Sequence, residues 1–268
     1  MKEKIMSIAA TEFDDKITKW KQEMDLPWAK LKYKLDQANL AKHLGQNQMR
    51  ILDAGGGNGL DAISFAKQGH LVDIVDYSQQ MLADIHDRTM QENIGEQIRT
   101  HLADVKNILD LFLDTQFDLI MCHNVLQYID DIPLLFRDFA KLLKPDGVVS
   151  ILSVNRYSIP YHAAFIDNNL AQALAQLDTR ISKTKIFDAV MTNYCAEEIK
   201  ELLEKVGIVP EGDYGIRCIC DYWGDNERKL DPIIFEQIER LEFALTDLHP
   251  YKLLARYFQV VGRKANRA

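Results

Sequence analysis

The sequence predicts an α/β fold, with a Rossmann-like, mostly parallel seven-stranded sheet and helices on both of its faces. Short apolar runs alternate with stretches of helical periodicity from residue 50 to residue 155. These runs are nearly continuous, as expected for strands that are buried on both faces of a parallel sheet. A glycine cluster at 55–59 joins the first run to a helical stretch. Ligands of open α/β sheets bind at such connections, beyond the carboxyl ends of the strands.

The elements of this core follow in order along the chain. Apolar runs predict strands at 50–55, 71–76, 98–103, 117–123 and 147–154. Apolar residues at helical spacing predict helices at 60–68, 78–92, 105–114 and 132–143. Pro145-Asp146-Gly147 predicts a turn before the fifth strand, because proline presets one backbone dihedral and glycine accepts a positive one.

The flanking segments predict a helical N-terminus and two insertions. Residues 13–44 have helical spacing with Pro27 in the middle, and residues 156–190 are also helical in pattern. Beyond them we expect a helix at 196–206 that ends at Gly207, a strand at 215–223, a helix at 231–247, a short helix near 251–256 and a last strand at 257–263. The chain is therefore expected to be one domain, 1–268, with an N-terminal helical segment at 1–46, a helical lid at 156–190 and a helical insertion at 224–256.

Composition limits the class of protein. With 268 residues and 47% hydrophobic composition, the chain can bury a full core. The net charge of -8 excludes a global basic field, so nucleic acid would have to bind to a local patch. No apolar run approaches the roughly 18–20 residues that span a bilayer, and the N-terminus has no signal-peptide pattern. Four cysteines are too few for a disulfide framework, and Cys218-x-Cys220 lacks zinc spacing. We expect a cytoplasmic protein without a metal site.

Acidic residues follow three successive predicted strands. Asp53 precedes the glycine cluster, Asp76 ends the second strand and Asp104 follows the third. Glycines let the main chain approach a ligand closely, and a carboxylate accepts hydrogen bonds from ribose hydroxyls. We therefore expect an adenosine-type site, in which Asp76 binds the ribose and Asp104 accepts from the amino group of adenine.

The glycine pattern leaves two cofactor classes open. Gly57-x-Gly59-x-x-Ala62 satisfies the permissive dinucleotide fingerprint, so a nicotinamide-dependent oxidoreductase is one alternative. However, Asp53 lies two residues before the glycines, where dinucleotide-binding folds usually have an apolar residue.

Four segments resemble class I S-adenosylmethionine-dependent methyltransferases. LDAGGGNG, VDYSQQML, FDLIMCHNVLQYID and LLKPDGVVSI occur in the order and at the intervals of that family, between residues 51 and 155. With YGIRCICDY and PYKLLARYFQVVGRK, they also resemble the bacterial tRNA 5-carboxymethoxyuridine methyltransferases across nearly the whole chain. The resemblance implies S-adenosylmethionine as cofactor and tRNA as a partner, with methyl esterification of a modified wobble uridine.

The narrower resemblance also implies cofactor-binding residues. Lys32 lies near the position of a family arginine that holds the methionine carboxylate, and so keeps the cation without the planar fork of arginine. The full set of expected cofactor residues is Lys32, Asp53, Gly55, Gly56, Gly57, Asp76, Tyr77, Ala103, Asp104 and His123.

A carboxylate acceptor would require cations rather than a base, because it is already ionised at neutral pH. Arg217 is the first candidate to hold it, with Arg156 and Arg256 as supporting cations. Tyr222, which is near Arg217 in the same predicted strand, is the candidate for stacking on the base. His123 could contact the cofactor, act as a base or bond to local backbone groups. Arg217, His123 and Tyr222 form the expected catalytic set.

Two further functions remain open at this point. One is methylation of a small-molecule metabolite, which the acidic composition favours. The other is a silent methyltransferase-like subunit that stabilises a partner, against which the acids Asp53, Asp76 and Asp104 argue.

Overall fold

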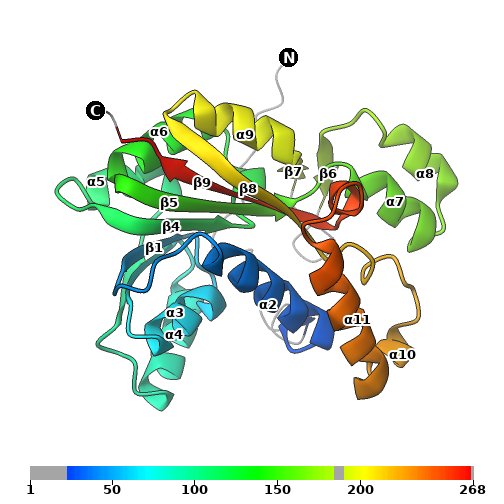
Figure 1. Cartoon of the computed structure of the whole chain (residues 1–268), viewed down its shortest axis with the longest axis horizontal. Helices are drawn as coiled ribbons and strands as arrows, with labels where there is room; N and C mark the ends of the chain where they lie inside the picture. The colour runs from blue at the N-terminus through cyan, green and yellow to red at the C-terminus, as the bar shows by residue number, and fades with distance from the viewer. Residues whose placement is uncertain (1–22, 184–189, 267–268) are drawn as a thin grey trace.

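The computed structural model describes residues 23–183 and 190–266, and Figure 1 shows its arrangement. A seven-stranded sheet has the order β3-β2-β1-β4-β5-β9-β8. Neighbouring strands from β3 to β5 are parallel, whereas β9 runs antiparallel to both β5 and β8. The strands are β1 (Arg50–Ala54), β2 (Leu71–Asp76), β3 (Ile98–Leu102), β4 (Phe117–His123), β5 (Leu143–Val154), β8 (Ile208–Ile216) and β9 (Tyr257–Lys264). The predicted mostly parallel, seven-stranded sheet is confirmed.

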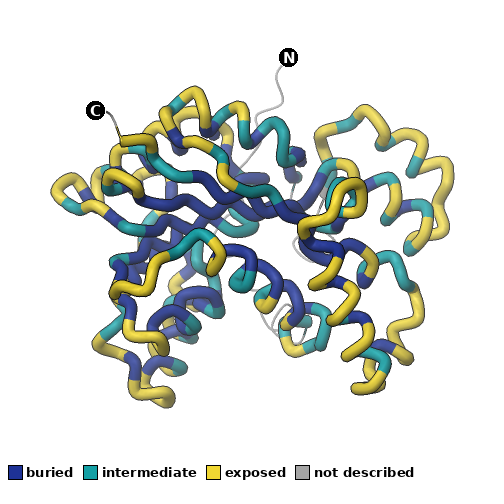
Figure 2. The backbone as a smooth tube through the Cα atoms, viewed as in Figure 1, coloured by how far each residue is buried: buried dark blue, intermediate teal, exposed yellow. Residues whose placement is uncertain are grey.

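Helices cover both faces of this sheet (Figure 1). One face packs on α5 (Ile108–Leu111), α6 (Ile132–Leu142) and α9 (Ala196–Glu204). The other packs on α2 (Pro27–Ala41), α3 (Leu60–Lys67) and α4 (Gln79–Gln91). Figure 2 shows that the central strands between these layers are mostly buried, whereas the edge strand β3 has no buried residue and the edge strand β8 is only partly buried. This double cover explains why the strands read as nearly continuous apolar runs.

The segment after β5 is only partly helical. It contains α7 (Ser158–Phe165) and α8 (Leu170–Ala175), followed by a two-stranded antiparallel hairpin of β6 (Ile181–Lys183) and β7 (Val190–Thr192). The expectation of helix throughout 156–190 was therefore wrong at β6 and at Val190, where β7 begins. Residues 184–189, like the part of the N-terminal helix expected at 13–22, lie outside the described residues.

The strand expected at 215–223 was misplaced. β8 ends at Ile216, and residues 217–225 form a loop that leads to α10 (Asn226–Lys229) and α11 (Pro232–Leu245). Arg217 takes a positive φ of 61°, which interrupts the extended backbone. The carboxylate of Glu242 in α11 then accepts hydrogen bonds from the amides of Cys218, Ile219 and Cys220, at 2.6, 2.8 and 2.7 Å. These amides are therefore not available to a sheet.

The start of β5 also differs from expectation. The segment expected as a turn is included in the strand, which begins at Leu143, and the residue with a positive φ, 60°, is Asp146 rather than Gly147. The pairing with β4 shifts register between Phe117 and Leu119, so the strand is irregular here. A short 3₁₀ helix at Tyr251–Leu254 precedes β9.

Replacing Glu242 with glutamine should lower the free energy of unfolding by about 2–4 kcal/mol. The side chain is fully buried, and an amide has only one oxygen for three amides that need an acceptor. Urea denaturation would measure the loss. Glu236→Gln, at an exposed site on the same helix, should change stability by less than about 0.5 kcal/mol. Equal stabilities for the two variants would contradict this role of Glu242.

Two further features concern the whole described chain. All four cysteines are free and buried. Among residues 23–183 and 190–266, no helix has both the length and the apolar character needed to cross a membrane.

Candidate active site

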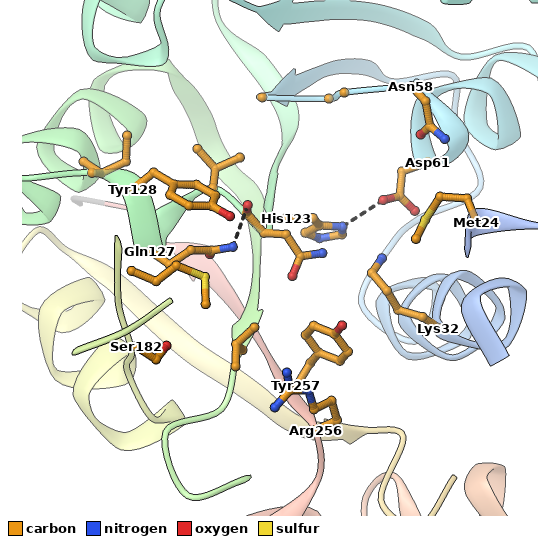
Figure 3. Close-up of a pocket in the computed structure, with 18 of the residues that line it drawn as sticks. Met24, Lys32, Asn58, Asp61, His123, Gln127, Tyr128, Ser182, Arg256 and Tyr257 are labelled. Atoms are coloured by element: carbon orange, nitrogen blue, oxygen red, sulfur yellow. Dashed lines mark hydrogen bonds and ion pairs between the residues drawn. The ribbon is translucent and has the colours of Figure 1, made fainter. Parts of the chain in front are cut away.

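A cavity of about 950 Å³ opens at the carboxyl ends of β1, β2 and β4. The glycine loop and the end of β2 form one part of its wall, and α2, α7 and the start of β9 form others. In Figure 3, Tyr128 and Gln127 face Asp61 and Lys32 across the space, with Tyr257 and Arg256 near its lower edge. The expected cofactor residues that line it are Lys32, Asp53, Gly55, Gly56, Gly57, Asp76, Tyr77, Asp104 and His123. Ala103 is not among the lining residues.

The glycine loop depends on the absence of side chains at particular positions. Gly55 has a φ of 79°, and a Cβ there would lie 2.3 Å from a methyl carbon of Val125. A Cβ on Gly56 would lie 2.6 Å from Asp53 Oδ2. Gly57 has a φ of 53° and open space where a Cβ would point. The first two glycines therefore let the loop pack against β1 and the 124–125 segment, and the third allows the left-handed turn that exposes backbone to the cavity.

The acids at the strand ends hold backbone amides. Asp76 Oδ2 accepts from the amide of Gly57 at 2.9 Å, and its Oδ1 accepts from the amide of Ser78 at 2.9 Å. Asp104 Oδ1 accepts from the amide of Lys106 at 2.9 Å and lies exposed at the cavity. An ionised carboxylate offers about four acceptor positions. Both acids therefore fix the loops around the cavity, and Asp104 keeps acceptor capacity for a ligand.

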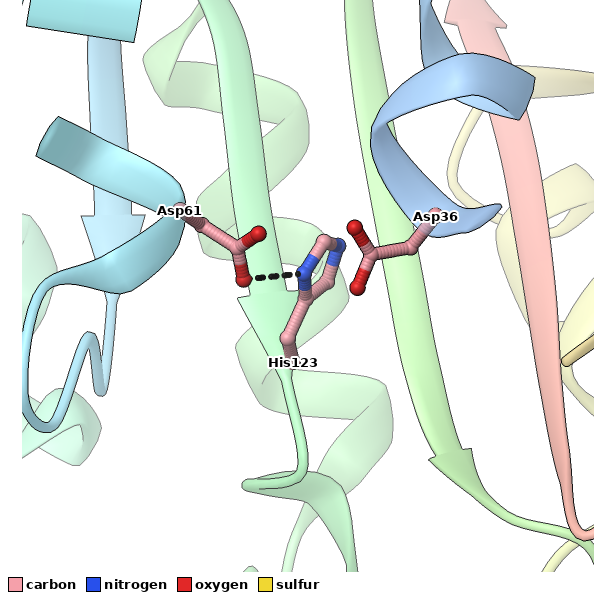
Figure 4. Close-up of side chains that lie close together, drawn as sticks. All are labelled: Asp36, Asp61 and His123. Atoms are coloured by element: carbon pink, nitrogen blue, oxygen red, sulfur yellow. Dashed lines mark hydrogen bonds and ion pairs between the residues drawn. The ribbon is translucent and has the colours of Figure 1, made fainter. Parts of the chain in front are cut away.

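A buried ionic cluster lies beside the glycine loop (Figure 4). His123 Nδ1 is 3.1 Å from Asp61 Oδ2, and His123 Nε2 is 2.9 Å from the hydroxyl of Ser150. The Lys32 ammonium donates to Asp36 Oδ2 at 3.0 Å. Because both ring nitrogens of His123 are engaged, neither is free to take a proton from an acceptor. This geometry argues against the base role that the sequence left open.

The pKa values in the cluster are shifted in opposite directions. Burial raises the pKa of the Asp53 carboxyl to about 7, and the neighbouring Asp61 charge adds to the rise. Burial likewise raises the pKa of Asp36 to about 7. Burial also opposes ionisation of Asp61, but the Lys32 ammonium and the hydrogen bond with His123 outweigh it and lower the pKa of Asp61 to about 2. Burial lowers the pKa of His123, yet its bond to Asp61 reverses the sign, so that the pKa is raised.

The ligand atoms of Asp36, Asp61 and His123 lie within 4.8 Å of one another, close enough to share a cation. However, the Lys32 ammonium already bonds to Asp36, and its pKa is raised because Asp36 and Asp61 outweigh the effect of burial. A metal ion would have to lie against this fixed positive charge. The residues fit a buried ion-pair network better than a metal centre.

The ligand-free protein should become less stable as the pH rises from about 5 to about 8. Asp36 and Asp53 bind protons more tightly in the folded state, because their pKa of about 7 exceeds the unfolded value of 3.8. Stability from such groups is lost as the pH rises through the folded pKa, and each unit of difference corresponds to about 1.4 kcal/mol. The raised pKa of His123 acts in the same direction. Asp61 stays ionised over this range.

Urea denaturation at several pH values would measure this trend. Asp53→Asn should flatten the curve because it removes one of the groups with a raised pKa, whereas Asp110→Asn, at an exposed site on α5, should not. A curve that rises with pH, or one that is identical in all three proteins, would contradict the prediction.

Arg256 lines the cavity on the side away from the glycine loop. One guanidinium nitrogen donates to the hydroxyl of Ser158 at 3.3 Å, and the guanidinium carbon lies 5.9 Å from the ring centre of Tyr257. Within residues 23–183 and 190–266, the salt bridges include no carboxylate partner for Arg256. The cavity therefore has a cation available for an anionic ligand.

The other candidate substrate residues lie outside the cavity lining. Arg217 is buried in an ion pair with Asp221, with Nε 2.7 Å from Oδ2, and it also donates to the backbone of Trp28 and to the hydroxyl of Tyr257. It can therefore position Tyr257, but it does not face the cavity. Our expectation that Arg217 holds the acceptor relied on the strand at 215–223, which does not form.

Arg156 and Tyr222 are also engaged elsewhere. Arg156 lies near Cys195 Sγ, at 3.9 Å, and near a carboxylate oxygen of Glu198, at 3.8 Å. The Tyr222 hydroxyl donates to the carbonyl of Leu254. Of the three arginines that the sequence suggested, the structure brings only Arg256 to the cavity.

Several lining residues were missed from the sequence. Asp61 lies in the first turn of α3, directly after the glycine loop, where a polar residue beside a ligand site could have been noticed. Tyr257 follows Arg256 at the start of β9. Gln127 is held by its donation to the carbonyl of Asn124, at 2.9 Å, and by the hydroxyl of Ser153. No sequence pattern marks Tyr257 or Gln127, because only the tertiary fold brings them to the cavity.

The chain is similar to known methyltransferases. A methyltransferase domain model matches residues 51–147. The tRNA 5-carboxymethoxyuridine methyltransferase of Escherichia coli (strain K12) is 26% identical over 231 residues, which are 85% of each chain. A ubiquinone biosynthesis O-methyltransferase of Pasteurella multocida (strain Pm70) is 27% identical over 184 residues, 66% of this chain and 74% of the relative.

A solved structure shares the fold. The 1,6-didemethyltoxoflavin-N1-methyltransferase of Burkholderia thailandensis, with bound S-adenosylhomocysteine, aligns with a TM-score of 0.56 and 17% identity, over 96% of this chain and 88% of that one. The family model and these relatives are methyltransferases, which favours S-adenosylmethionine over the nicotinamide alternative.

The cavity fits that cofactor. Asp53 Oδ2 is buried without a hydrogen-bond partner in the described part of the chain, and Asp104, just beyond β3, retains acceptor capacity. The acidic character of this wall suits a cationic ligand, and Lys32 supplies a cation for the ligand's carboxylate. The chain is thus an S-adenosylmethionine-dependent methyltransferase, with a methyltransferase domain at residues 51–147, and it resembles the class I enzymes and the tRNA 5-carboxymethoxyuridine methyltransferases.

Proposed function

We propose that this enzyme methylates the carboxylate of 5-carboxymethoxyuridine at the wobble position of tRNA. The observation that carries the proposal is Arg256, a cation in the cavity wall with no carboxylate partner among the described residues. The similarity to the Escherichia coli relative, over 85% of both chains, supports the choice of acceptor.

The residues of the cavity suit a reaction that transfers no proton. S-adenosylmethionine, when bound, would supply a methyl group on a sulfonium. Transfer of that methyl to a carboxylate oxygen of the acceptor would leave the electron pair of the broken bond on sulfur and give a thioether and a methyl ester. Because the carboxylate is ionised at neutral pH, no base is required, in keeping with the engaged nitrogens of His123.

The protein would contribute mainly by alignment. Arg256 would bind one carboxylate oxygen and direct the other towards the cofactor, and Tyr257 beside it would limit how far the guanidinium can move. Orienting two reactants can lower a barrier by roughly 7–11 kcal/mol, which makes alignment sufficient as the main source of rate.

The function is tested by incubating the protein with labelled S-adenosylmethionine and total tRNA from a bacterial strain that lacks this activity. After digestion to nucleosides, the label should appear in the methyl ester of 5-carboxymethoxyuridine. Mild alkali should release it as methanol, because an ester is hydrolysed under conditions that leave methyl ethers and N-methyl bases intact. Label in another nucleoside, or none, would contradict the proposal.

A phenolic metabolite is the second candidate acceptor. His162 lines the cavity with Nδ1 3.4 Å from a carboxylate oxygen of Asp167, an arrangement that could remove a phenolic proton. The relatives of this chain include ubiquinone biosynthesis O-methyltransferases. If this candidate is correct, turnover with a catechol should exceed turnover with tRNA, and His162→Gln should abolish it.

A further inference from the structure

A row of aromatic rings leads from Arg256 to the surface of the molecule. The hydroxyl of Ser158 accepts from Arg256, and the side chain of Tyr222 lies close enough to interact with both. The ring centre of Tyr222 lies 6.0 Å from that of Tyr161, which in turn lies 5.9 Å from the ring centre of Phe165. The row therefore extends outward from the cation at which we place the acceptor carboxylate.

The outer two rings of the row are exposed to solvent. Phe165 is 61% exposed and Tyr161 is 41% exposed, and no other aromatic side chain among residues 23–183 and 190–266 is as exposed as Phe165. Both belong to α7, which lies beside α8 at the edge of the molecule (Figure 1). Single exposed apolar residues are common on protein surfaces, but adjacent exposed aromatic rings beside a cavity are typical of a binding surface.

The helix α7 connects this surface to the cavity. One of its faces contributes Ile159, His162 and Ala163 to the cavity lining, whereas Tyr161 and Phe165 lie on another face. A polymer whose reacting unit enters the cavity would therefore pass along this helix with its neighbouring units. A free metabolite would be contained by the cavity and would not reach the outer rings.

We propose that Tyr161 and Phe165 form a stacking site for an unpaired nucleobase next to the acceptor nucleotide. The inference rests on the proposed function. It adds a site by which the enzyme would bind a nucleic acid substrate more tightly than a free nucleoside. Aromatic rings accept any base through their flat faces, and alanine substitution typically costs 1–3 kcal/mol for each stacked base, which corresponds to about 5- to 150-fold in affinity. Such a site lets an acidic protein bind nucleic acid without a large basic patch.

The test compares two acceptors with the same reacting group. Initial rates are measured with bacterial tRNA that carries 5-carboxymethoxyuridine and with the free nucleoside 5-carboxymethoxyuridine. Phe165→Leu and Tyr161→Leu should raise KM for tRNA at least about 5-fold and leave KM for the nucleoside within about 2-fold. Phe165→Trp should retain tRNA binding, because it preserves a flat ring, whereas a purely apolar contact would be satisfied by leucine.

Leu174→Ala is the matched control, since Leu174 is an exposed apolar residue of α8 outside the cavity lining. This substitution should leave KM unchanged for both acceptors. The inference is overturned if Phe165→Leu and Tyr161→Leu bind tRNA as the wild type does, as would be expected if this surface docked another protein. The inference is also overturned if these two substitutions raise KM for tRNA and KM for the nucleoside equally. Failure of the wild type to methylate either acceptor would instead contradict the proposed function.

Discussion

Replacing Asp76 with alanine should weaken S-adenosylmethionine binding by at least about 100-fold. The carboxylate ends β2 in the cavity wall, and we expect it to accept hydrogen bonds from both ribose hydroxyls. Each bond to a charged acceptor contributes roughly 1.5–3 kcal/mol, and every 1.4 kcal/mol is tenfold in affinity. The substitution also removes the acceptor of the Gly57 amide, so the glycine loop loses its support at the same time.

Titration calorimetry with S-adenosylmethionine would measure this effect. Asp87→Ala changes an exposed acid on the helix that follows and should bind the cofactor as the wild type does. Circular dichroism would check that both variants remain folded. Asp76→Asn should lie between the wild type and alanine, because the amide keeps one acceptor oxygen. Affinity within threefold of wild type in Asp76→Ala would place the ribose elsewhere.

Replacing Arg256 with alanine should lower kcat/KM for the tRNA acceptor by about 100- to 1000-fold. Losing one partner of a desolvated ion pair costs roughly 2–5 kcal/mol, and Arg256 is the cation that we place against the acceptor carboxylate. Affinity for S-adenosylmethionine should change by less than about threefold, since the expected cofactor residues lie in other parts of the wall. Arg256→Lys should be more active than Arg256→Ala but less active than the wild type, because an ammonium keeps the positive charge but lacks the planar, bidentate donor geometry of a guanidinium.

The comparison with other arginines makes this prediction specific. Arg240→Ala, at an exposed site on α11, should change neither kcat/KM for the tRNA acceptor nor the affinity for S-adenosylmethionine. Arg217→Ala should lower stability as well as activity, because it breaks a buried ion pair with Asp221 and releases the hydroxyl of Tyr257. Equal loss of cofactor affinity and turnover in Arg256→Ala would contradict a role confined to the acceptor.

The cavity wall that contains the expected cofactor residues was largely predictable, because these residues follow from local sequence. Each expected acid lies directly after an apolar run, and parallel strands bring their carboxyl ends to the same edge of the sheet. The glycine loop is likewise marked by its own residues. Both patterns lie within a few consecutive residues, so they can be recognised in the sequence without knowledge of the tertiary fold.

The acceptor side was predicted less well because it depends on contacts between distant segments. Nothing in the sequence distinguishes Arg217 from Arg256. In the structure, Arg217 is buried in an ion pair with Asp221, whereas Arg256 lines the cavity. The misplaced strand at 215–223 has the same origin. Its apolar residues suggest extension, yet a glutamate more than 20 residues away binds the amides that a sheet would need.

The two walls of the cavity come from separate stretches of the chain, and this has an evolutionary consequence. The cofactor wall is built mostly within residues 51–128, inside the stretch that matches the general methyltransferase domain, whereas α7, α8 and Arg256 come from later segments. Changes in the later segments can alter the acceptor while the cofactor wall stays intact. Descendants of one ancestral enzyme could thus diverge in substrate by remodelling a single rim of the cavity.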